Sequence, residues 1–157
     1  MPNYVLICCT GHKDDVLLIL KDRPAWQKGR LNLPGGKIEE GETPEQAATR
    51  ELKEETGYEP LVPIRLMGTM QDGSFTIFCL KAVVDDKISP KPREGETEVV
   101  SWIPWHEALD DDRLMLNLKV IIPLIRNSVA EWIIGDTYRG HDKYRHTIKI
   151  SISQRNS

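Results

Sequence analysis

Runs of apolar residues separated by turn-forming residues predict short strands along most of this chain. Two such runs, rich in Val, Ile, Leu and Cys, occupy residues 4–10 and 16–21, and five turn-like residues from Gly11 to Asp15 separate them. This pattern predicts an antiparallel pair of strands. Further apolar runs predict strands at residues 66–70, 75–84, 98–103, 132–137 and 144–150.

Two segments have the features of helices. Thr43 can cap a helix whose first residue is proline, and Gln46 can complete a capping box. Gly57 then supplies the stop. Residues 116–125 show the apolar pattern of a largely buried helix, interrupted or bent near Pro123. Between these elements, the segments 23–36 and 85–97 hold many breakers or charges and are predicted to be loops.

Length and composition fit one domain. The chain has 157 residues, of which 39% are hydrophobic and 29% charged, so we predict a single domain over residues 1–153 and a flexible tail over 154–157. Cys8, Cys9 and Cys79 lie in apolar runs without metal-ligand spacing, which indicates reduced core residues.

Charge and hydropathy narrow the choice of partners and location. The net charge is -3 and no long Lys/Arg run is present, so an extended nucleic acid is not expected as a partner. No signal peptide is recognisable, and no apolar run reaches the roughly 20 residues that span a bilayer. We therefore expect a cytoplasmic protein without a membrane partner.

Three carboxylates lie near the end of the first predicted helix. Offsets of three and four residues from Glu51 bring Glu54 and Glu55 onto its helical face. Like charges at this spacing repel, and a helix C-terminus disfavours carboxylates by about 0.3 to 1 kcal/mol each. A hard divalent cation between the side chains would remove this cost. The cluster therefore predicts a metal site, with a solvated acidic face as the alternative.

Residues 36–58 resemble the Nudix box. Gly36 is followed after five residues by Glu42, then after seven by Arg-Glu-Leu, and then by Glu-Glu and Gly57. Tyr58 is the one departure, because an aliphatic residue is usual at this packing position. The resemblance implies an alpha/beta/alpha sandwich around a mixed beta-sheet, an α/β fold. It also implies metal-dependent hydrolysis of a nucleoside diphosphate linked to another group, with Mg2+, or Mn2+ as a substitute. Glu42 resembles the loop glutamate that braces the box.

The resemblance also gives expected roles to the remaining box residues. Glu54 and Glu55 are expected to be direct metal ligands, with Glu51 as a further ligand. Arg50 is expected to orient a glutamate through charge-assisted hydrogen bonds. Gly36 resembles the family glycine whose backbone carbonyl reaches the metal.

The general base need not lie in the box, because a carboxylate on an opposing loop can accept the proton of water. Glu94, Glu96 and Glu98 are the candidates. Glu94 resembles the base of MutT-type relatives, whereas Glu98 resembles a metal-contacting glutamate found elsewhere in the family, and we prefer Glu98. A merely solvated charged loop is the alternative.

Within the family, the box is particularly similar to MutT-type pyrophosphohydrolases, which act on oxidised guanine nucleoside triphosphates. Asn32 and Asn117 resemble base-reading residues, since an amide offers both a donor and an acceptor; ordinary turn or cap roles are the alternative. Arg23, together with Lys21, is expected to face phosphate. Lys37 is a further candidate for substrate binding.

Two other functions stay open. The chain could hydrolyse ADP-ribose or a nucleotide sugar, or it could be a non-catalytic nucleotide-binding module. Such modules commonly lose a box glutamate, and none is lost here. The expected partner is a small-molecule nucleotide, and a homodimer is compatible with the sequence.

Overall fold

Strands make up most of the framework in the computed structural model, which describes residues 2–72, 74–127, 131–136 and 148–153. The elements are β1 Asn3–Thr10, β2 Asp15–Leu20, the 3-10 turn η1 Ala25–Gln27, β3 Leu31–Asn32, β4 Gly35–Lys37, α1 Pro44–Thr56, β5 Arg65–Asp72, β6 Phe75–Val83, β7 Val99–Pro104, α2 Trp105–Asp110, α3 Leu118–Asn127, β8 Glu131–Asp136 and β9 Ile148–Ser153. The predicted tail, residue 137 and the first part of the last predicted strand, 144–147, lie outside the described residues.

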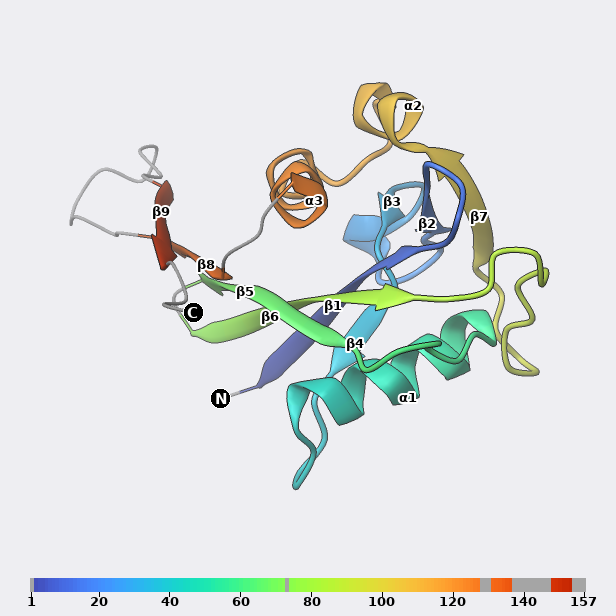
Figure 1. Cartoon of the computed structure of the whole chain (residues 1–157), viewed down its shortest axis with the longest axis horizontal. Helices are drawn as coiled ribbons and strands as arrows, with labels where there is room; N and C mark the ends of the chain where they lie inside the picture. Colours follow the sequence, from blue (N-terminus) through green and yellow to red (C-terminus); the bar gives the residue numbers. More distant parts are fainter. Residues whose placement is uncertain (1, 73, 128–130, 137–147, 154–157) are drawn as a thin grey trace.

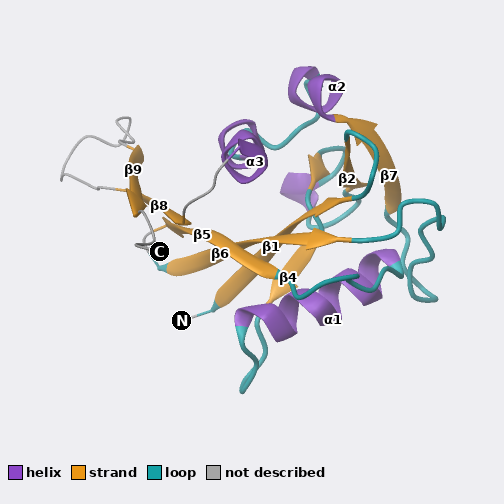
Figure 2. Cartoon of the chain, in the orientation of Figure 1, coloured by secondary structure: helices purple, strands orange, loops and turns teal. Residues whose placement is uncertain are grey.

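The strands form a mixed sheet and a smaller antiparallel one. The mixed sheet has the order β4-β1-β6-β5-β8-β9, in which β1 is parallel to β6 and β5 is parallel to β8. The smaller sheet has the order β3-β2-β7. Helix α1 and helix α3 lie on opposite sides of the mixed sheet (Figures 1 and 2).

The side-chain alternation of β1 explains the layers. Val5, Ile7 and Cys9 pack with α1, whereas Cys8 packs with α3 on the other face. Both faces of the strand are therefore covered by a helix. The predicted alpha/beta/alpha sandwich is confirmed.

The predicted pairing of β1 with β2 is wrong, although both strands are where the pattern placed them. β1 is hydrogen-bonded between β4 and β6, and β2 lies between β3 and β7. Each strand is apolar on both faces, which requires that both faces be covered but does not decide which strands pair along its edges. A short connecting turn did not decide the partner.

The segment 23–36 is not a plain loop, because it contains η1, β3 and the first two residues of β4. A Cβ atom on Gly35 would lie 2.0 Å from the carbonyl oxygen of Val5. Only glycine permits this approach of β4 to β1, so a residue that resembled a breaker is here a requirement for pairing. The segment 85–97 contains no helix or strand, as predicted, and the six-residue helix α2 was not predicted.

Helix α1 has the predicted ends. The backbone N–H of Gln46 donates to Thr43 Oγ1 at 3.1 Å, and that of Thr43 donates to Gln46 Oε1 at 2.9 Å, which completes the capping box. Gly57 ends the helix with a left-handed φ of 79°. Helix α3 begins two residues later than predicted and continues through Pro123.

The three cysteines are buried and free of disulfide bonds, as predicted. Burial raises the pKa of Cys8 to about 12 and those of Cys9 and Cys79 further, so the thiols stay protonated. None of the described helices combines the length and apolar character needed to cross a bilayer.

Candidate active site

Two of the three box carboxylates of α1 point at the paired glycines of β4. The backbone N–H of Gly35 donates to Glu55 Oε2 at 2.9 Å. A Cβ atom on Gly36 would lie 2.4 Å from Glu51 Oε1. The absence of side chains on β4 therefore lets both carboxylates reach the backbone of the strand.

These carboxylates are poorly hydrated and close to a further acid. Burial raises the pKa of Glu51, and burial together with the negative charges of Glu51 and Glu98 raises the pKa of Glu55 to about 8. The side chain of Glu98 is only 6% exposed and pairs with Lys21 Nζ at 2.8 Å. The Lys21 charge also stabilises ionised Glu55. From the sequence we expected Lys21 to face phosphate alongside the favoured Arg23. In the structure Lys21 is a member of this carboxylate cluster.

Arg50 fixes the box by binding several of its members. Its Nε and Nη2 atoms donate to the two carboxylate oxygens of Glu42 at 2.7 and 2.9 Å, which lowers the pKa of Glu42 to about 2. Its Nη1 atom donates to Glu51 at 2.7 Å and lies 3.5 Å from Glu54. The guanidinium therefore bridges two acids that repel each other, and Glu42 braces it.

Glu54 faces the loop 85–97 instead of β4. Its carboxylate lies 3.3 Å from Arg93 Nη1, and its backbone carbonyl accepts from the Arg93 N–H at 2.9 Å. Arg93 also pairs with Glu96 at 3.1 Å, and Arg23 lies 3.5 Å from the other oxygen of Glu96. Sequence reasoning missed Arg93, since its only signal was a cation in a charged loop.

Tyr58 joins the same loop to the helix. Its hydroxyl donates to the carbonyl of Ile88 and accepts from Trp102 Nε1 at 3.0 Å. The two rings meet edge to face, with centroids 5.9 Å apart. From the sequence we interpreted Tyr58 as a packing residue only. That interpretation leaves out its hydroxyl, which connects α1, the loop and β7.

Among the described residues, no group of three or more His, Cys, Asp or Glu side chains is gathered closely enough to hold a metal ion as it stands. Arg50 and Lys21 occupy the carboxylates instead. The donor chemistry nevertheless fits a hard dication, because Glu51, Glu55 and Glu98 supply carboxylate oxygens and burial disfavours the ionised forms of Glu51 and Glu55. Gly36 lies beside Glu51, as the predicted carbonyl ligand would.

The two candidate bases are placed differently. Glu98 is buried beside Glu55 and Lys21, and it also accepts the Asp22 N–H at 3.2 Å. Glu94 is exposed and makes no ion pair with a described residue. Position thus favours Glu98.

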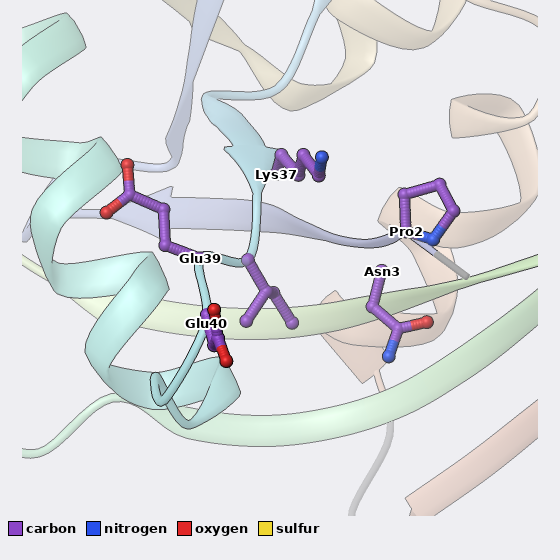
Figure 3. Close-up of a pocket in the computed structure, with 6 residues that line it drawn as sticks. Pro2, Asn3, Lys37, Glu39 and Glu40 are labelled. Carbon is purple, nitrogen blue, oxygen red and sulfur yellow. The ribbon is translucent and has the colours of Figure 1, made fainter.

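Two of the predicted substrate ligands, Arg23 and Lys37, lie outside the carboxylate cluster that contains Lys21. Arg23 has a side chain that is 67% exposed. Gly36 faces Glu51, so the next residue of the strand, Lys37, points to the opposite face of the sheet. There Lys37 lines a hollow of about 450 Å³ with Pro2, Asn3 and Glu40 and extends away from α1 (Figure 3).

The two candidate base readers differ in their hydrogen bonds. The Asn32 amide donates to Gln27 at 3.1 Å and accepts the Leu33 N–H at 2.9 Å. Asn117 Oδ1 is buried and has no partner in the described chain. A buried acceptor without a donor is costly, so of the two amides only Asn117 has an oxygen whose hydrogen-bonding capacity is unused within the described chain.

The chain belongs to the Nudix family. A family model, the NUDIX domain, matches residues 2–124, which is most of the chain. The prediction made from residues 36–58 is thereby confirmed. Hydrolases of this family generally use divalent metal ions.

Named relatives differ in their substrates. The chain is 37% identical over 102 residues to a mouse ADP-sugar pyrophosphatase, covering 60% of this chain and 46% of that protein. It is 47% identical over 50 residues to an Escherichia coli 8-oxo-dGTP diphosphatase, covering 32% and 39%. The chain thus spans less than half the length of these relatives. A crystal structure of a MutT protein from Bacillus halodurans shares the fold, with a TM-score of 0.65, 20% identity and coverage of 96% and 97%.

Proposed function

We propose that the chain hydrolyses nucleoside diphosphate derivatives with Mg2+, for which Mn2+ can substitute. The observation that carries this proposal is the convergence of Glu51 and Glu55 on the glycines of β4, beside buried Glu98. Stability alone does not account for so many poorly neutralised acids in one place.

Glu51, Glu54 and Glu55 would hold the metal, with the Gly36 carbonyl and Glu98 as further ligands. When bound, the metal supplies positive charge to the diphosphate oxygens and makes water more acidic. Glu98 is the candidate that removes the water's proton, and Glu94 is the second candidate. The Nη1 atom of Arg50 keeps Glu51 and Glu54 oriented, while Glu42 binds the Nε side of the same guanidinium.

The favoured substrate is a nucleoside or deoxynucleoside triphosphate, including an oxidised one, cleaved to the monophosphate and pyrophosphate. Asn117 supports this choice, because its unpaired acceptor suits a base that offers an N–H donor. The replacement Asn117→Ala should bring the rates for triphosphates with different bases closer together, while the rate for any single base should change less than their ratio. Equal selectivity before and after the change would exclude Asn117 as a base reader.

ADP-ribose or a nucleotide sugar is the second candidate substrate. The observation favouring it is the identity to the mouse ADP-sugar pyrophosphatase, which extends over 102 residues and therefore well beyond the box. A non-catalytic binding module is the less favoured alternative, since all box acids are retained.

One product analysis separates these functions. The protein, with Mg2+ or Mn2+, is incubated with dNTPs, oxidised dGTP, ADP-ribose and nucleotide sugars, and the products are resolved by chromatography. Pyrophosphate release from a triphosphate supports the first proposal, and AMP release from ADP-ribose supports the second. Glu54→Gln should abolish either activity, whereas Glu45→Gln on the same helix is the matched control. Binding without any turnover would indicate a binding module.

A further inference from the structure

A second pocket lies on the face of the mixed sheet opposite α1. It measures about 220 Å³ and is bordered by the loop between β1 and β2, by β6, and by helices α2 and α3. Lys81 lines it, and the register partner of Lys81 on β1 is Cys8, which faces α3. The pocket is therefore separate from the carboxylates that α1 carries. We call it the basic pocket, after its cationic lining residues Lys13, Lys81 and Arg126.

Lys81 is in an unfavourable position for a sheet residue. It is half-buried, and its register partner on β5 is Arg65, another cation. Like charges directly opposite each other on neighbouring strands are destabilising. Neither side chain pairs with a carboxylate in the part of the chain that the structure describes. The same holds for the side chain of Lys13, so the pocket has positive charge that the described chain does not neutralise.

Arg126 is held in place at the wall of the basic pocket. Its guanidinium lies 5.1 Å from the centroid of the buried Trp105 ring. It also donates to both oxygens of Asp14 at 2.7 and 2.8 Å. Asp14 is the sole carboxylate among the described residues that line the pocket. Three cations and one acid thus surround a preformed hollow.

We propose that the basic pocket binds a phosphate group, either free inorganic phosphate or pyrophosphate, or the phosphate of a small phosphorylated molecule. An oxyanion would neutralise Lys81 and Lys13 at once, and it would accept hydrogen bonds from both ammonium groups. The neighbouring acid Asp86 does not compete for them, because its carboxylate accepts the Lys13 N–H and bonds His12. The proposal does not depend on the proposed catalytic function.

The test measures anion binding by the whole chain in EDTA, so that the carboxylate cluster repels the anion. Inorganic pyrophosphate is titrated at constant ionic strength, with calorimetry and the indole N–H signal of Trp105 as two readouts. We expect saturable one-to-one binding and a shift of that signal. Lys81→Met should weaken the affinity about tenfold or more, because it removes a charged hydrogen bond. Lys119→Met, an exposed charge change on α3, is the matched control and should have less than about a twofold effect.

Lys13→Met provides a second variant and should also weaken binding, so the test remains decisive if Lys81→Met fails to fold. Parallel titrations with orthophosphate and with glycerol phosphate distinguish a free anion from a phosphomonoester. Absence of saturation at millimolar pyrophosphate would overturn the proposal. Equal weakening by all three lysine variants would do so too, because it would indicate general attraction of anions and no defined site.

Discussion

The carboxylate cluster of Glu51, Glu55 and Glu98, called the acidic cluster below, and the basic pocket both concentrate charge of one sign. They differ in how that charge is neutralised. In the acidic cluster, Arg50 lies 2.7 Å from Glu51 and Lys21 lies 2.8 Å from Glu98. In the basic pocket, Arg126 has such a partner and Lys81 has none in the described chain. The cations of the acidic cluster thus orient its acids without fully neutralising them, since the pKa values of Glu51 and Glu55 stay raised, whereas Lys81 has no carboxylate partner in the described chain.

The largest expected effect separates catalysis from stability in the acidic cluster. We expect Glu55→Gln to lower turnover by about a thousandfold or more, because a candidate metal ligand loses its charge. In EDTA the same change should raise the free energy of unfolding by about 1 kcal/mol or more, since a buried and weakly paired charge disappears while Gly35 keeps an acceptor. Steady-state rates and urea unfolding measure the two effects.

Glu45→Gln, in the first turn of the same helix, is the control for the Glu55 variant and should leave turnover nearly unchanged. A Glu55→Gln protein that is less stable in EDTA would show that its carboxylate is well neutralised without metal. The interpretation of Glu55 as a buried, poorly neutralised acid that a metal ion would stabilise would then lose its basis.

A smaller effect tests the β4 backbone on which the acids rest. Gly35→Ala should cost about 2 to 3 kcal/mol of folding free energy, because the new Cβ would meet the Val5 carbonyl, which cannot move cheaply. Gly36→Ala would meet only the flexible end of Glu51. We therefore expect the second variant to lose activity more than stability. Chemical denaturation and rate measurements on both proteins check this difference, and equal loss of stability would contradict it.

The acidic cluster could be predicted because its signals are close together in the sequence. The box spans residues 36–58, and the cap and stop of its helix follow from their residue types. Helical spacing places Glu51 and Glu55 together, whereas Glu54 turns to Arg93 of the loop 85–97. Lys21 and Arg93 were harder to place, because they reach the box from other elements. Their residue types alone do not say which acid each will pair with.

The strand pairing and the basic pocket could not be predicted, because both depend on segments far apart in the chain. Both β1 and β2 are apolar on two faces, which predicts burial but not a partner. Lys13, Lys81 and Arg126 have no shared motif, and the fold alone brings them to one hollow. Long-range contacts of this kind leave no local periodicity to read.

A still smaller effect is expected when the attachment of the loop 85–97 to α1 is weakened. Tyr58→Phe should cost about 1 to 2 kcal/mol, since Trp102 Nε1–H and the Ile88 carbonyl lose their partner while the ring contact stays. We also expect kcat to fall more than KM changes, because the loop leads to Glu98. Tyr4→Phe is the control, as its hydroxyl bonds no described residue. Wild-type rates and stability in Tyr58→Phe would show that this tyrosine acts by packing alone.

The smallest effect tests the loop that forms one wall of the basic pocket. The side chain of Asp86, which is 5% exposed, lies against this loop, and hydrogen bonds from the Lys13 N–H and His12 lower its pKa to about 2. The unfolded value is near 4, so the folded state binds fewer protons between these values. The stabilisation by ionised Asp86 is present above about pH 4 and is lost as the pH falls toward 2. In thermal unfolding measured across that range, Asp86→Asn should be less stable than wild type at pH 6, and the difference should shrink with acid. Exposed Asp112→Asn is the control; a difference that stays constant down to pH 2 would mean that the Asp86 charge does not hold this wall of the basic pocket.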